Sequence, residues 1–121
     1  MFTKNLVEFI TRTEYEDLPE EVITTAKGAI LDFIGVAMAG SQEESGRIIG
    51  EMVREIESSP EAVVIGHGFR AGCSLAALAN GTAGHVLDYD DCLDFPHVGL
   101  GHPGTGTVSY THLTLPTNRE V

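Results

Sequence analysis

The sequence predicts a mainly α-helical protein, and three observations support that class. Apolar residues recur at helical spacing in residues 2–10 and 48–56, with charged residues on the opposite face. The segment Pro19–Ala39 keeps this spacing and becomes apolar on nearly all sides beyond Ala29, as buried helices do. Only one short run is β-branched, so we expect at most one extended segment, near residues 62–65.

Local signals set the ends of these helices. Pro19 suits the first position of a helix, and Glu20 and Glu21 place negative charge in its first turn, where the helix dipole favours it. Gly40 is expected to end that helix as a C-cap. A further helix is predicted over Cys73–Asn80, with its start expected near Arg70 or Ala71, directly before the most polar stretch of the chain.

Length, charge and cysteine content restrict the class of protein. With 121 residues there is room for one domain or part of one. The net charge of −11 disfavours nucleic acid and anionic membranes as partners, because both attract basic surfaces. Cys73 and Cys92 lack metal-binding spacing and form no disulfide framework, so two reduced thiols are expected.

The N-terminal residues predict no targeting segment. They contain neither the apolar region nor the small-residue cleavage site of a signal peptide. The longest apolar stretch, Ala29–Ala39, is interrupted by Asp32 and is too short to span a bilayer. We therefore expect a cytoplasmic protein.

Most of the candidate chemistry lies in the stretch Asn80–Asp91. Asp88, Asp90 and Asp91 place three carboxylates close together, which fits either a solvated acidic loop or a functional site. His85 precedes Asp88 by three positions, so the two share one helix face if the helix continues that far. Otherwise His85 stands at the C-terminus of the helix.

Two further histidines follow in a stretch rich in glycine and proline. His97 and His102 lie among residues that predict a tight, irregular loop, the usual carrier of reactive side chains. His67, between Gly66 and Gly68, is interpreted instead as a turn residue.

Two chemistries fit a histidine with several aspartates. Histidine and carboxylates can bind a divalent metal and support a phosphohydrolase. Alternatively, a histidine serves as acid or base in metal-free proton transfer at carbon, with an aspartate to orient it. A helical interaction module without catalysis is the third reading, and the residues alone leave all three open.

A family resemblance separates these readings. Four segments resemble the MmgE/PrpD family, which includes 2-methylcitrate dehydratases and cis-aconitate decarboxylases; they are Leu31–Gly40, Ala77–His85, Leu87–Asp91 and His102–Gly104. The resemblance implies the N-terminal part of a largely helical main domain in a homodimeric enzyme. It also implies proton transfer on a small di- or tricarboxylate, without a metal or other cofactor. The implied activity is that of a hydro-lyase, most closely 2-methylcitrate dehydratase-like.

The resemblance also assigns candidate site residues. Asp88 and His102 fall at active-site positions and are the expected catalytic residues. His85, Asp90, Asp91 and Cys92 are expected to bind substrate or support the site. Cys92 stands where a relative has threonine, so a hydroxyl contact does not carry over. The spacer from Cys92 to His102 is longer than in the decarboxylase pattern, which disfavours that specific activity.

The last residues differ in kind from the rest of the chain. Val108–Thr117 matches, codon by codon, the transposon mosaic-end adapter of sequencing libraries and the primer sequence that follows it. We therefore expect residues 108–121 to be adapter read-through and residues 1–107 to be a partial helical domain. On that expectation the native gene continues beyond Thr107, and this chain alone is inactive.

Overall fold

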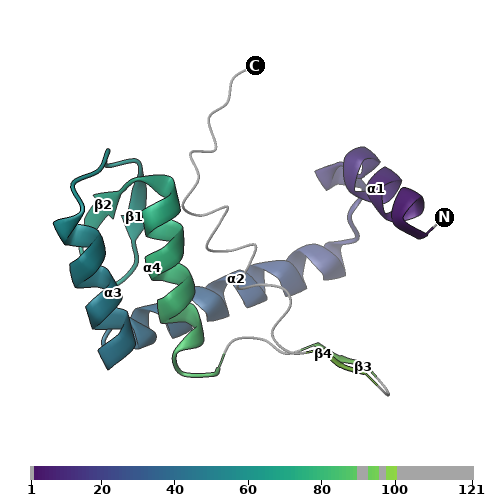
Figure 1. Cartoon of the computed structure of the whole chain (residues 1–121). Coiled ribbons are helices and arrows are strands. Elements are labelled where there is room, and N and C mark those ends of the chain that lie inside the picture. Colours follow the sequence, from purple (N-terminus) through teal and green to yellow (C-terminus); the bar gives the residue numbers. More distant parts are fainter. Residues whose placement is uncertain (1, 90–92, 96–97, 101–121) are drawn as a thin grey trace.

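The computed structural model describes residues 2–89, 93–95 and 98–100, and it confirms the mainly helical class (Figure 1). Its helices are α1 (Phe2–Arg12), a 3-10 turn (Tyr15–Asp17), α2 (Glu20–Gly40), α3 (Glu44–Glu55) and α4 (Cys73–His85). The strands are β1 (Ala62–Val64), β2 (Phe69–Ala71), β3 (Leu93–Phe95) and β4 (Val98–Leu100).

The expectation of at most one extended segment was wrong. β1 pairs with β2 in an antiparallel hairpin, in which Ala62 stands opposite Ala71 and Val64 opposite Phe69. The turn between them uses Gly66 and Gly68 at φ values of +78° and +71°, a region that glycine enters without steric cost. β2 has only three residues, too few for a β pattern in the sequence, so its pairing depends on this turn.

α4 lies at the centre of the fold. It packs against α2, α3 and β1, and Figure 1 shows α3, the β1–β2 hairpin and α4 side by side. Small side chains on α4 allow these close approaches. At Gly84, for example, a Cβ atom would lie 2.3 Å from Cε2 of Phe33 on α2. One buried cluster joins α3, the hairpin and α4; its members are Val53, Ala62, Val64, Ala71, Ala76 and Ala79.

α2 is less buried than its composition predicts. Phe33 and Ala37 form a second buried cluster with Ala83 of α4. Leu31 and Met38, however, are 71% and 55% exposed. Within the described part of the chain, α4 is the main partner of α2, so only one stripe of this helix is covered.

α2 is longer than the apolar stretch Ala29–Ala39, on which the expectation of no membrane span was based. α2 has 21 residues, and by length and composition alone it could cross a membrane. Core helices of soluble proteins and signal sequences have the same length and composition, so these two features do not assign α2 to a membrane.

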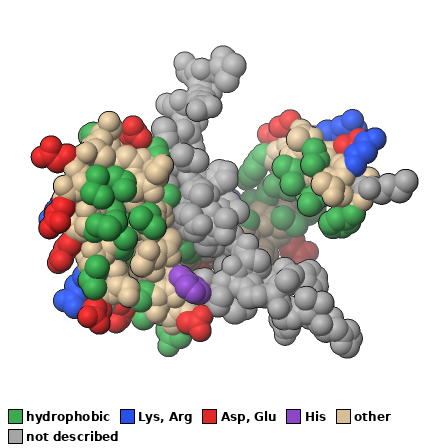
Figure 2. Space-filling model, viewed as in Figure 1, with side chains coloured by type: hydrophobic (Ala, Val, Ile, Leu, Met, Phe, Trp, Pro, Cys, Tyr) green, Lys and Arg blue, Asp and Glu red, His purple; other side chains and the backbone are tan. Residues whose placement is uncertain are grey.

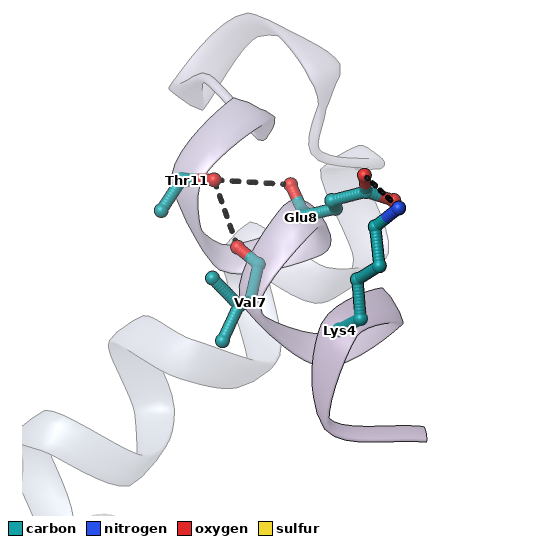
Figure 3. A network of polar contacts seen from close by, with 4 residues as sticks. All are labelled: Lys4, Val7, Glu8 and Thr11. Atoms are coloured by element: carbon teal, nitrogen blue, oxygen red, sulfur yellow. Dashed lines mark hydrogen bonds and ion pairs between the residues drawn. The ribbon is translucent and has the colours of Figure 1, made fainter. Parts of the chain in front are cut away.

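α1 contributes little to the core. None of its residues is buried, and Phe2, Phe9 and Ile10 are mostly exposed. In Figure 1 it lies at the far end of α2 from the α3–α4 body. Its side-chain contacts are local, as Figure 3 shows: Lys4 pairs with Glu8 at 3.9 Å, and the Thr11 hydroxyl donates to the carbonyl of Val7 at 2.8 Å. Such an exposed ion pair stabilises a protein by less than about 1 kcal/mol.

Candidate active site

Asn80, the first residue of the acidic motif, has a structural role. Its side chain is 1% exposed and joins α4 to the hairpin region. The Ile65 backbone N–H donates to Asn80 Oδ1 at 2.8 Å, and Asn80 Nδ2 donates to the Val63 carbonyl at 2.9 Å. A buried amide with both ends satisfied fixes the relative position of its partners. Asn80 therefore sets where α4 continues toward the candidate residues.

α4 continues beyond its predicted end. The sequence predicts the helix to Asn80, whereas the structure extends it to His85. Interior glycines disfavour a helix by about 1 kcal/mol each, which explains the shorter prediction at Gly81 and Gly84. The packing of Gly84 against Phe33 offsets this cost, because only a residue without a side chain fits there.

His85 and Asp88 do not share a helix face, because the helix ends at His85. The sequence left two alternatives open, and the structure places His85 in the last turn of α4. The Asp88 backbone N–H donates to the His85 carbonyl at 2.9 Å, so a tight turn brings these two candidates together.

Asp88 has the one positive φ value among the described residues other than glycine, at +55°. Aspartate tolerates this left-handed region better than most residues, yet the conformation costs on the order of 1 kcal/mol. Residues held in such conformations are concentrated at active sites and ligand clamps. The turn directs the chain away from the axis of α4 at the first predicted catalytic residue, whose side chain is exposed.

The remaining candidates lie outside the described residues. These are Asp90, Asp91, Cys92, His97 and His102. Around them, the structure describes an antiparallel pair of strands, β3 and β4, in which Leu93 stands opposite Leu100. The prediction of an irregular loop throughout this stretch was therefore wrong for residues 93–95 and 98–100. The alternation of Leu93, Phe95, Val98 and Leu100 is the signal that could have found these strands.

No three histidine, cysteine or acidic side chains come together as metal ligands among residues 2–89. Most of the acidic motif and His102 lie outside this part of the chain. The metal-dependent reading therefore remains an alternative to be tested by experiment.

The opposite end of α4 holds a coupled pair of ionisable groups. The Cys73 backbone N–H donates to Glu61 Oε2 at 3.2 Å, so a carboxylate caps the positive end of the helix dipole. The hydrogen bond from the Cys73 thiol lowers the pKa of Glu61. The same hydrogen bond, aided by desolvation, raises the pKa of Cys73. Cys73 is thus a free thiol with reduced reactivity.

A second polar site was missed by the sequence analysis. A pocket of about 200 Å³ is lined by Arg47, Gly50, Glu51, Arg54 and His67. The α3 residues in this set have spacings of three and four, which places them on one helix face. That spacing is visible in the sequence, but the turn that adds His67 is a tertiary feature.

The chain is similar to known proteins of one family. The sequence profile of the MmgE/PrpD N-terminal domain matches residues 4–108. A cis-aconitate decarboxylase-like protein of Aspergillus oryzae is 28% identical over 89 residues, which cover 74% of this chain and 18% of that relative. No solved structure matches the chain significantly.

The fold and the site together define a helical domain that presents an acidic turn at the end of its central helix. The chain belongs to the MmgE/PrpD family, and the matched region is the N-terminal domain of that family.

Proposed function

We propose that this chain is the N-terminal part of a lyase that acts by proton transfer on a small di- or tricarboxylate. The specific activity proposed is a hydro-lyase reaction, most closely 2-methylcitrate dehydratase-like. The family match over residues 4–108 carries this proposal, because it includes the positions of both Asp88 and His102. The strained turn at Asp88 supports it, because such strain is concentrated at functional sites.

In this proposal the two residues have different roles. His102 serves as the acid or base, or as a hydrogen-bond donor to the substrate, because imidazole exchanges protons near neutral pH. Asp88 contacts the substrate hydroxyl or orients a neighbouring group. His85, Asp90, Asp91 and Cys92 support the site. In a dehydration, a base removes the proton beside a carboxylate, and an acid protonates the departing hydroxyl, which leaves as water.

The substrate needs cations that the acidic motif does not contain. Within residues 1–107 the basic side chains are Lys4, Arg12, Lys27, Arg47, Arg54 and Arg70. Arg70 already donates to the carbonyls of Pro60 and Glu61. Since buried carboxylates need paired cations or donors, we propose that further parts of a longer, homodimeric, cytoplasmic enzyme complete the site. This chain alone is then inactive.

Decarboxylation is the second candidate reaction. The matched relative from Aspergillus oryzae is a cis-aconitate decarboxylase-like protein, and this observation favours that reaction over the other family activities. Both reactions use a small polycarboxylate and a positioned proton donor or acceptor. Incubating the full-length protein with 2-methylcitrate and with cis-aconitate distinguishes them, because dehydration releases water and decarboxylation releases carbon dioxide.

Substitution of the two proposed catalytic residues tests the mechanism. His102→Ala in the full-length protein is expected to lower turnover by about 10²- to 10⁴-fold, the usual contribution of a positioned acid or base. Asp88→Asn is expected to lower turnover as well, because it keeps the shape of the side chain but removes its charge. Asp17→Asn makes the same chemical change on the exposed 3-10 turn and should leave turnover unchanged.

Chelation separates the proposal from the phosphohydrolase reading. Activity on a tricarboxylate should survive a strong chelator, and added divalent metal should restore neither variant. If chelation abolished activity on a phosphoester while tricarboxylates stayed untouched, the lyase proposal would be wrong.

A further inference from the structure

The pocket lined by Arg47, Gly50, Glu51, Arg54 and His67 is called the arginine pocket. It lies outside the turn at His85–Asp88 that holds the first proposed catalytic residue. It is formed by one face of α3 and the turn between β1 and β2, and its lining includes neither His85 nor Asp88. Its volume of about 200 Å³ is below the range of about 300–1,000 Å³ for drug-sized ligands, so it suits only a small molecule.

Arg54 is held in place on one side of the pocket. Its Nη2 donates to the His67 carbonyl at 3.1 Å, and its guanidinium carbon lies 4.7 Å from the centre of the Phe69 ring. These contacts use one of the five N–H donors of the guanidinium group. The remaining donors are thus presented by a side chain with restricted freedom, which lowers the entropic cost of binding a ligand.

Arg47 adds a second positive charge to the pocket. Within the described part of the chain, neither Arg47 nor Arg54 has a carboxylate within ion-pair distance, although Glu51 lines the same pocket. On the face shown in Figure 2, acidic side chains are distributed around the α3–α4 body. The pocket therefore brings together two arginines in a chain of net charge −11.

His67 closes the other side of the pocket. Its ring lies so close to α3 that a Cβ atom on Gly50 would be 2.2 Å from Cε1 of the imidazole. The ring also meets Phe69 edge to face, at 6.2 Å between centroids. Its Nε2 is buried and has no hydrogen-bond partner among the described residues. A buried polar atom without a partner is costly, so a ligand that supplies one is favoured.

We propose that this pocket binds a small oxyanion, through a carboxylate or phosphate group. The guanidinium groups of Arg47 and Arg54 make the charge-assisted contacts, for which arginine geometry is well suited. The His67 ring turns toward the bound group, and Nε2 gains the partner that it lacks. Glu51 lines the same pocket, and its negative charge opposes a bound anion, so the affinity is modest.

Binding of two probes to the full-length protein tests this site. Inorganic phosphate and tricarballylate, a tricarboxylate without a hydroxyl group, are titrated separately by calorimetry, while the His67 imidazole signals are followed by NMR. At least one probe should bind and shift those signals. Binding of phosphate alone assigns a phosphate ligand, and binding of tricarballylate assigns a carboxylate ligand.

Matched variants assign the binding to the pocket. Arg47→Gln should weaken it by about tenfold or more, as expected for the loss of a charge-assisted hydrogen bond. Lys27→Gln removes the same charge from the exposed surface of α2 and should leave the affinity unchanged. His67→Phe keeps an aromatic ring but removes Nε2, so it should weaken binding by about threefold to tenfold.

Three results would overturn the proposal. The first is that neither probe binds in the millimolar range, and the second is that Lys27→Gln weakens binding as much as Arg47→Gln. The third is a structure of the full-length protein in which one of its own carboxylates fills the pocket. Binding of tricarballylate that Arg47→Gln leaves unchanged also counts against the proposal, because it places that ligand outside this pocket, for instance at the catalytic site.

Discussion

Phe33 and Leu31 lie two residues apart on α2, yet Phe33 is 3% exposed and Leu31 is 71% exposed. Phe33 faces α4, where Gly84 leaves room for its ring. Leu31 points away from the only covered stripe of the helix in the described part of the chain. Hydrophobic content therefore decides whether a helix has a face to bury, whereas the neighbouring element decides which face is buried.

Replacing Phe33 and Leu31 in turn by alanine should give the largest difference in the free energy of unfolding. Phe33→Ala should lower the free energy of unfolding by about 3–5 kcal/mol, because it removes buried apolar surface and leaves a cavity. Leu31→Ala should change it by less than about 0.5 kcal/mol in this chain. Urea unfolding of both variants measures the difference. Repeating Leu31→Ala in the full-length protein shows whether another segment covers this face, since the cost would then rise to about 2–5 kcal/mol.

Loss of the Asn80 amide should have the next largest effect. Asn80→Ala leaves the Ile65 N–H and the Val63 carbonyl without their partner inside the body. The expected cost is about 2–4 kcal/mol, because each unsatisfied buried group costs about 1–3 kcal/mol. Hydrogen exchange of the Ile65 amide should become faster in the variant. Unchanged exchange would show that Asn80 does not hold the hairpin region on α4.

Two glycine substitutions compare the covered and uncovered parts of the helices more finely. Gly84→Ala should destabilise the protein by about 1–3 kcal/mol, because the added Cβ would overlap the Phe33 ring. Gly35→Ala on α2 meets nothing within 4 Å among the described residues. It should stabilise the protein by about 0.5–1 kcal/mol through its higher helix propensity. Thermal unfolding checks both signs, and destabilisation by Gly35→Ala would place a neighbour against that position.

The smallest expected effect concerns the N-terminus of α4. Because its hydrogen bond with Glu61 raises the pKa of Cys73, the thiol should react slowly with iodoacetamide at mildly alkaline pH. Glu61→Gln should speed that reaction, whereas Glu57→Gln, an equal charge change on an exposed neighbour, should not. Peptide mass spectrometry separates Cys73 from Cys92. Equal rates in all three proteins would contradict the coupling.

The pH dependence of this pair has a defined sign. The folded-state pKa of Glu61 is lowered, so its contribution to stability is present above the unfolded pKa and is lost as the pH falls through the folded pKa. The folded-state pKa of Cys73 is raised, so its contribution is present below the unfolded pKa and is lost as the pH rises. The two groups therefore stabilise the start of α4 most at pH values between the unfolded pKa of Glu61 and the unfolded pKa of Cys73.

The sequence by itself determined the helical class, the family resemblance and the bounds of α2, predicted as Pro19–Ala39 and observed as Glu20–Gly40. Apolar spacing suffices there because it acts within one segment. The capping predictions were each off by one residue, since Pro19 is the N-cap rather than the first helical residue and Ser41, not Gly40, is the C-cap. The sequence also singles out Asp88, and its expected catalytic role stays a prediction. The expected roles of His102 and the other candidates beyond Tyr89 stay predictions.

Only the tertiary structure decided the features that depend on contacts between distant segments. β2 exists because β1 offers it a partner across a glycine turn. α4 extends to His85 because Phe33 packs on Gly84, whereas local propensity would end the helix earlier. The meeting of His67 with Arg47 and Arg54 likewise requires α3 and the hairpin turn to lie together. Spacing along one segment cannot specify such contacts, because their energy comes from packing between elements.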